Sequence, residues 1–151
     1  MLLTDLLSPE RVRVPLQARD KRGILRELAR LLVDTAGGDF EDVLSAVEER
    51  ETVLSTGIGF GVAIPHGRSP TLPDLAVVCG STPEPVPFDA IDGQPVRLFF
   101  LLAGPERSAG QHVKALGRLA RLIRGEALRT RLLECRTGAE FHEALVQAEA
   151  S

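Results

Sequence analysis

The stretch VRLFFLLA, residues 96–103, decides the fold of this 151-residue chain. It contains a single charged side chain among branched and aromatic ones, and a second run, LAVVCG at residues 75–80, has the same character. Successive side chains of a strand point to opposite faces of its sheet, so a strand that is apolar at nearly every position is typically covered on both faces. The two runs therefore predict central strands with helices packed on either side.

The N-terminal third of the chain predicts one short strand and two amphipathic helices. Residues 12–16 alternate with charge, which favours a strand. Apolar side chains at helical spacing follow Asp20, a predicted N-cap, and the helix is expected to end at Gly37, because glycine takes left-handed angles at low cost. A second helix is predicted from Asp39 to about Arg50.

The middle of the chain predicts loops and short strands. Residues 55–61, STGIGFG, are rich in glycine and predict a loop, and residues 62–64, VAI, predict a short strand. We expect residues 66–68, HGR, to form an exposed turn. Residues 81–95 contain several prolines and an Asp-Gly pair, so they predict a loop between the two apolar runs.

The last third predicts three helices. Residues 108–111, SAGQ, fit a capping box ahead of an apolar stripe, residues 126–134 predict a shorter helix, and residues 137–140, TGAE, fit a second capping box. The predicted order is strand, two helices, three strands and three helices. It predicts an α/β fold, a three-layer α/β/α sandwich with a small mixed β-sheet flanked by helices, and the length suits one domain over residues 1–151.

The composition excludes several classes of protein. The formal net charge of −3 argues against a general nucleic-acid binder and against a polybasic membrane anchor. The two cysteines have no paired spacing and make neither a disulfide framework nor a zinc site. With no signal peptide and no apolar run long enough to span a bilayer, we expect a cytoplasmic protein without membrane insertion.

The histidines carry the candidate chemistry, because imidazole is the side chain whose ordinary pKa lies near neutrality. His66 stands between Pro65 and Gly67, just past a short apolar strand. A stiff backbone and a neighbouring glycine suit an exposed nucleophile with one ring nitrogen held by a hydrogen bond and the other free. The alternative is a solvated turn residue, and the spacing leaves both interpretations open.

Two further side chains suit an anion. His112 lies in the first turns of a predicted helix, where peptide N–H groups and the helix dipole favour negative charge; the alternative is an exposed helical residue. Arg50 offers the paired donors that fit a phosphate, or else forms a surface ion pair with a neighbouring glutamate. Arg68 is a similar candidate, and His142 is expected at the surface.

Several familiar cofactor and catalytic motifs are absent from the sequence. Residues 57–61, GIGFG, do not match a dinucleotide fingerprint, because their glycines fall at other intervals. The chain has no GxxxxGK[ST], HExxH or GxSxG motif. We therefore expect neither a cofactor nor a metal.

Three blocks of sequence, in order, carry a resemblance to a known family. Residues 55–68 read STGIGFGVAIPHGR after the lead ERE, residues 88–96 read FDAIDGQPV, and residues 111–122 begin QHV at the head of a predicted helix. These blocks resemble type 2 enzyme IIA domains of the phosphoenolpyruvate-dependent sugar phosphotransferase system, the fructose, mannitol and nitrogen-related class. Phe60 departs from the nitrogen-related members, which often carry Asn there.

The resemblance implies an enzyme in the sense of a phosphocarrier. His66 would accept a phosphoryl group from phospho-HPr at Nε2, while His112 and Arg50 would hold the phosphoryl oxygens. The group would then pass to a cysteine of an enzyme IIB. No metal or nucleotide would be needed.

Two other interpretations stay open. In the first, the chain is a nitrogen-related regulator in which phosphorylation of His66 controls binding to other proteins. In the second, it is a non-catalytic interaction domain that takes up no phosphate. The sequence names neither the sugar, nor the acceptor or regulatory target, nor the oligomeric state.

Overall fold

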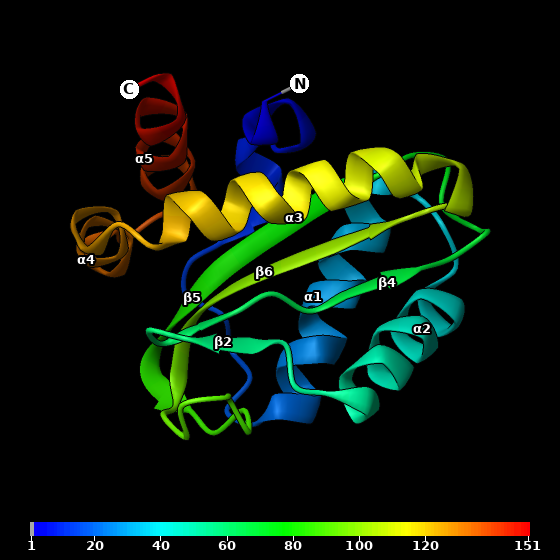
Figure 1. Cartoon of the computed structure of the whole chain (residues 1–151), viewed down its shortest axis with the longest axis horizontal. Helices are drawn as coiled ribbons and strands as arrows, with labels where there is room; N and C mark the ends of the chain where they lie inside the picture. The colour runs from blue at the N-terminus through cyan, green and yellow to red at the C-terminus, as the bar shows by residue number, and fades with distance from the viewer. Residues whose placement is uncertain (1) are drawn as a thin grey trace.

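The computed structural model describes residues 2–151, and within them a six-stranded mixed sheet lies between two layers of helices (Figure 1). The strands are β1 (Val12–Arg13), β2 (Gly57–Gly59), β3 (Val62–Ala63), β4 (His66–Arg68), β5 (Ala76–Val86) and β6 (Val96–Gly104). The α-helices are α1 (Lys21–Ala36), α2 (Phe40–Val53), α3 (Ala109–Ile123), α4 (Glu126–Glu134) and α5 (Gly138–Ala150), and short 3-10 helices span Leu3–Leu6, Pro9–Arg11 and Glu106–Ser108. The predicted three-layer α/β/α sandwich is confirmed.

Strand β6 is the centre of the sheet. It pairs antiparallel with β5 along one edge and parallel with both β3 and β4 along the other. From Leu98 to Ala103 its side chains alternate between two cores: Phe99, Leu101 and Ala103 pack in the layer of α1 and α2, and Leu98, Phe100 and Leu102 pack in the layer of α3, α4 and α5. The near-continuous apolar run therefore reflects burial on both faces, as predicted.

The predicted helix ends are largely confirmed. The carboxylates of Asp20 and Asp39 accept from the backbone N–H groups of Gly23 and Asp42, and Thr137 forms the predicted capping box. The capping box at Ser108 is wrong, because a 3-10 turn leads directly into α3 and leaves Ser108 without the extended backbone that a capping hydroxyl needs. Helix α2 also continues beyond Arg50, to Val53.

Three predictions for the middle of the chain are wrong. The glycine-rich segment contains β2, which turns at Gly59-Phe60-Gly61 to pair with β3. Residues 66–68 form strand β4 instead of an exposed turn, because they continue the ladder along β6. Strand β5 runs into the predicted loop 81–95, where Val86 pairs with Val96 despite the intervening prolines.

Phe60, which stands where the nitrogen-related members often carry Asn, has a left-handed backbone conformation. Phe60 has φ of 60° and is 61% exposed, with the Arg129 guanidinium 4.6 Å from its ring centre. Left-handed backbone is unfavourable for a bulky residue and tolerated by Asn, so the tip of this hairpin is a position where Asn fits with less strain.

Close backbone packing joins β4 to α2. A Cβ added to Gly67 would lie 3.0 Å from the Val47 nitrogen and 3.1 Å from the Ala46 carbonyl carbon, both in the backbone of α2. Only a residue without a side chain allows this approach. Gly67 therefore sets the distance between the strand that carries His66 and the helix that carries Arg50.

We predict opposite effects of alanine at two glycines. Gly67→Ala should lower the free energy of unfolding by about 1–3 kcal/mol, because the methyl group meets helix backbone that cannot rotate away. Gly117→Ala should raise it by about 0.5–1 kcal/mol, because this site within α3 is exposed and nothing lies within 4 Å of the added carbon. Denaturant titrations would measure both, and a Gly67→Ala variant as stable as the parent would contradict the packing described.

Candidate functional site

The backbone fixes the orientation of the His66 ring. His66 begins β4 opposite Leu102 of β6, and the Leu102 N–H donates to the carbonyl of Pro65 at 3.0 Å. The ring nitrogen Nδ1 lies 2.9 Å from the carbonyl oxygen of Ile64. Because a carbonyl oxygen only accepts, Nδ1 carries the proton in this bond, and Nε2 of the neutral ring keeps its lone pair.

The surroundings of His66 favour its neutral form. Partial burial is the largest effect and lowers its pKa below the ordinary value, while the bond to Ile64 opposes this shift. The nearby guanidinium of Arg50 lowers the pKa further. At neutral pH the half-buried ring is therefore uncharged, with a free Nε2.

His112 lies beside His66 and is almost completely buried. It sits in the first turn of α3 with 4% of its surface exposed, and the two imidazole rings meet edge to face with their centres 5.7 Å apart. Burial lowers the pKa of His112 to about 4, with smaller effects from His66 and Arg68. The interpretation of His112 as an exposed helical residue is therefore wrong, and its neutral ring offers one N–H donor.

The two arginines lie at the same cavity as the histidines. An open cavity of about 560 Å³ is lined by His66 and His112 together with Arg50 and Arg68. Arg50 donates from Nη1 to the carbonyl of Leu54 at 2.8 Å, and Arg68 forms an exposed ion pair with Glu106 at 3.0 Å. The cavity thus combines a free imidazole nitrogen, a buried imidazole and permanent positive charge, a set that suits an anion.

Several side chains at this cavity were not singled out from the sequence. They are Ala46, Glu49 and Val53 on α2 and Val113 and Leu116 on α3. Val53 and Val113 are 81% and 64% exposed, so they form an apolar rim. Helical spacing was the available signal, since Ala46 and Val53 stand four residues before and three after Arg50.

Other candidate features do not join the site. His142 is half-buried on α5 and does not line the cavity. Across residues 2–151, no cluster of three or more His, Cys, Asp or Glu side chains has an arrangement that would hold a metal ion. None of the helices in this range is both long and apolar enough to cross a membrane.

Comparisons with known proteins show which family the chain is similar to. A family model described as "Phosphoenolpyruvate-dependent sugar phosphotransferase system, EIIA 2" matches residues 5–148. A nitrogen regulatory protein of Bradyrhizobium diazoefficiens is 35% identical over 100% of this chain and 99% of its own length. The fructose-specific EIIABC component of Bacillus subtilis is 33% identical over 97% of this chain, but over only 22% of its own length.

A solved relative has the same fold. The crystal structure of nitrogen regulatory protein IIA-Ntr from Neisseria meningitidis matches with a TM-score of 0.88 and 32% identity, covering 95% of this chain and 98% of that one. With the family model matching nearly all of the sequence, the chain belongs to the EIIA 2 family of the phosphoenolpyruvate-dependent sugar phosphotransferase system.

Proposed function

We propose that this protein is a cytoplasmic phosphocarrier, a single domain that accepts a phosphoryl group on Nε2 of His66 and passes it to a second protein. The observation that carries the proposal is the bond from Nδ1 to the Ile64 carbonyl, which leaves Nε2 as the nucleophilic nitrogen. Family membership supports a role in phosphoryl transfer, and the cavity around His66 supplies the groups that such a transfer needs.

The reaction follows from these groups. The Nε2 lone pair attacks the phosphorus of a phosphohistidine on the donor, for which phospho-HPr is the proposed protein. The new N–P bond forms as the donor N–P bond breaks, and that electron pair returns to the donor ring, so no proton has to leave His66. Arg50 and His112 stabilise the three equatorial oxygens, whose charge dominates the transition state.

The second transfer is the same displacement in the other direction. In the transport role, the thiolate of a cysteine on an enzyme IIB attacks the phosphorus, the S–P bond forms, and Nε2 of His66 leaves with its electron pair. The exposed apolar rim of Val53 and Val113 gives donor and acceptor proteins a common surface to contact in turn.

A regulatory output is a second candidate. The relatives that match this chain over almost their whole length include proteins named as nitrogen regulatory proteins. In this role phosphorylation of the same histidine changes which protein the rim binds. Incubation of the phosphorylated protein with candidate acceptors distinguishes the roles, because only the transport role predicts loss of the label to an enzyme IIB.

Replacement of the nucleophile tests the proposal directly. With enzyme I, HPr and radiolabelled phosphoenolpyruvate, the parent protein should be labelled and His66→Ala should not, because Nε2 is the only atom proposed to form the N–P bond. His142→Ala is the matched control and should label like the parent. Label retained in His66→Ala would overturn the assignment.

Removal of His112 should slow the reaction without abolishing it. His112→Ala deletes one donor to the phosphoryl oxygens, an effect of about 100-fold on the transfer rate by analogy with single oxyanion donors. Rapid-quench kinetics would measure the rate, and thermal melting would verify folding, because the ring is buried. A folded variant with parental kinetics would remove His112 from the site.

The charge of Arg50 should be visible in the titration of His66. Protonation of Nε2 blocks attack, so acceptance is lost as the pH falls through the pKa of His66, which partial burial holds below the ordinary value for histidine. Arg50→Gln removes a charge that disfavours the imidazolium, so it should move the midpoint to higher pH, whereas Arg50→Lys should preserve it. NMR titration of the unphosphorylated protein measures this midpoint, and an unchanged or lower value in Arg50→Gln would contradict the proposed proximity.

A further inference from the structure

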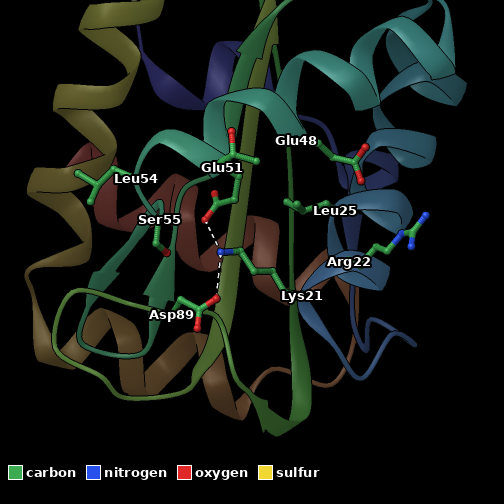
Figure 2. Close-up of a pocket in the computed structure, with 9 residues that line it drawn as sticks. Lys21, Arg22, Leu25, Glu48, Glu51, Leu54, Ser55 and Asp89 are labelled. Atoms are coloured by element: carbon green, nitrogen blue, oxygen red, sulfur yellow. Dashed lines mark ion pairs between the residues drawn. The ribbon is translucent and has the colours of Figure 1, made fainter.

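Glu51, the neighbour of Arg50 on α2, is a buried carboxylate that does not line the His66 cavity. Its side chain is 5% exposed and forms an ion pair with Lys21 of α1 at 2.8 Å. It also accepts from the backbone N–H of Thr56 at 3.0 Å and from the Thr56 hydroxyl at 2.5 Å. In Figure 2, Lys21 reaches from α1 to lie between Glu51 and Asp89.

A continuous series of hydrogen bonds leads from Glu51 to the ring of His66. The carboxylate holds Thr56, whose carbonyl oxygen accepts from the Ile64 N–H at 2.9 Å. The carbonyl oxygen of Ile64 in turn accepts from Nδ1 of His66 at 2.9 Å. The position of Thr56 therefore bears on the bond that selects the nucleophilic nitrogen.

The same segment holds Arg50. The carbonyl that accepts from Arg50 belongs to Leu54, two residues before Thr56. Leu54 is 59% exposed and follows the end of α2, so its own burial does little to fix it. The anchor that Glu51 provides at Thr56 is thus common to Arg50 and to the orientation of His66.

A structural ion pair alone would not require this arrangement. Burying a charge pair is costly, and well-packed apolar residues often stabilise a core as well or better. A carboxylate supplies directed hydrogen-bond acceptors, and an apolar side chain does not. Here the acceptors bind two donors of Thr56 and the Lys21 ammonium. The second partner of Lys21, Asp89, has a side chain that is 89% exposed and contributes little.

We propose that Glu51, held by Lys21, is a positioning residue for phosphoryl acceptance: it fixes residues 54–56 and through them orients the His66 ring and the Arg50 guanidinium. This proposal rests on the proposed function of His66. Glu51 faces a separate cavity on another side of α2, lined also by Leu25, Glu48 and Ser55 (Figure 2). Its replacement therefore removes no side chain that lines the cavity around His66.

The test compares Glu51→Gln with Glu48→Gln, a matched control one helical turn earlier on the wall of the same cavity. Glu51→Gln should lower kcat for phosphoryl acceptance by about 10- to 100-fold, as small misplacements of reacting groups do, while KM for phospho-HPr stays within about twofold. Glu48→Gln should behave like the parent. Lys21→Gln should resemble Glu51→Gln, and Lys21→Arg should restore the rate.

A second readout does not depend on phosphorylation. NMR of the His66 ring nitrogens should find the proton on Nδ1 in the parent protein and a mixture of both tautomers in Glu51→Gln. The pKa of His66 should also fall, because both the Glu51 charge and the Ile64 bond raise it, and this is the opposite direction from Arg50→Gln. Thermal melting identifies variants that are simply unfolded. If Glu51→Gln is unfolded, Thr56→Val is the milder substitution to test, because it removes only the hydroxyl that donates to Glu51.

The outcomes separate the two proposals. If the parent protein takes up no label, the proposed phosphocarrier function is wrong, whatever the NMR result. A labelled parent with a folded Glu51→Gln variant of equal kcat and unchanged tautomer overturns the positioning role alone. Altered tautomer with reduced kcat and constant KM supports it.

Discussion

Burial of both faces of strand β6 is the constraint on which the rest of the structure depends. Six side chains alternate into two separate cores, and each buried Leu or Phe contributes about 2 kcal/mol relative to exposure. A strand covered in this way requires a helical layer on either side. Other strands can then pair with β6 only along its two edges. Strand β5 pairs along one edge, and β4 pairs along the other.

The candidate site follows from this layering. Strand β4 places His66 beside the C-terminal half of β6, α2 brings Arg50 from one layer, and α3 brings His112 from the other. No single segment contains the site, so each helix must be held at the right distance from the strand. At Gly67 the backbone of β4 packs directly against the backbone of α2, and a side chain at this position would prevent that contact.

Much of the fold could be predicted because the spacing of apolar residues along the sequence indicates which faces of a helix or strand are buried. The run 96–103 predicted a doubly covered strand, and the capping side chains of Asp20, Asp39 and Thr137 predicted helix starts. The errors arose where partners distant in sequence decide the structure: β2 and β4 are short, glycine-containing strands that exist only through pairing. The sequence proposed His66, His112 and Arg50 as site residues, and the structure brings them to one cavity. The burial of His112 and the bonds of Glu51 depend on tertiary contacts that spacing does not reveal.

The electrostatics of the site resolve a conflict in the proposed chemistry. His66 has to be neutral to attack, yet the phosphoryl group that it gains carries negative charge. A guanidinium serves both needs, because Arg50 disfavours the imidazolium before transfer and attracts the phosphoryl oxygens after it. A second charged imidazole would not serve as well, since its charge would vary with pH. With a pKa of about 4, His112 is instead a neutral donor at physiological pH in the unphosphorylated protein, so permanent charge and directional hydrogen bonding come from two different residues.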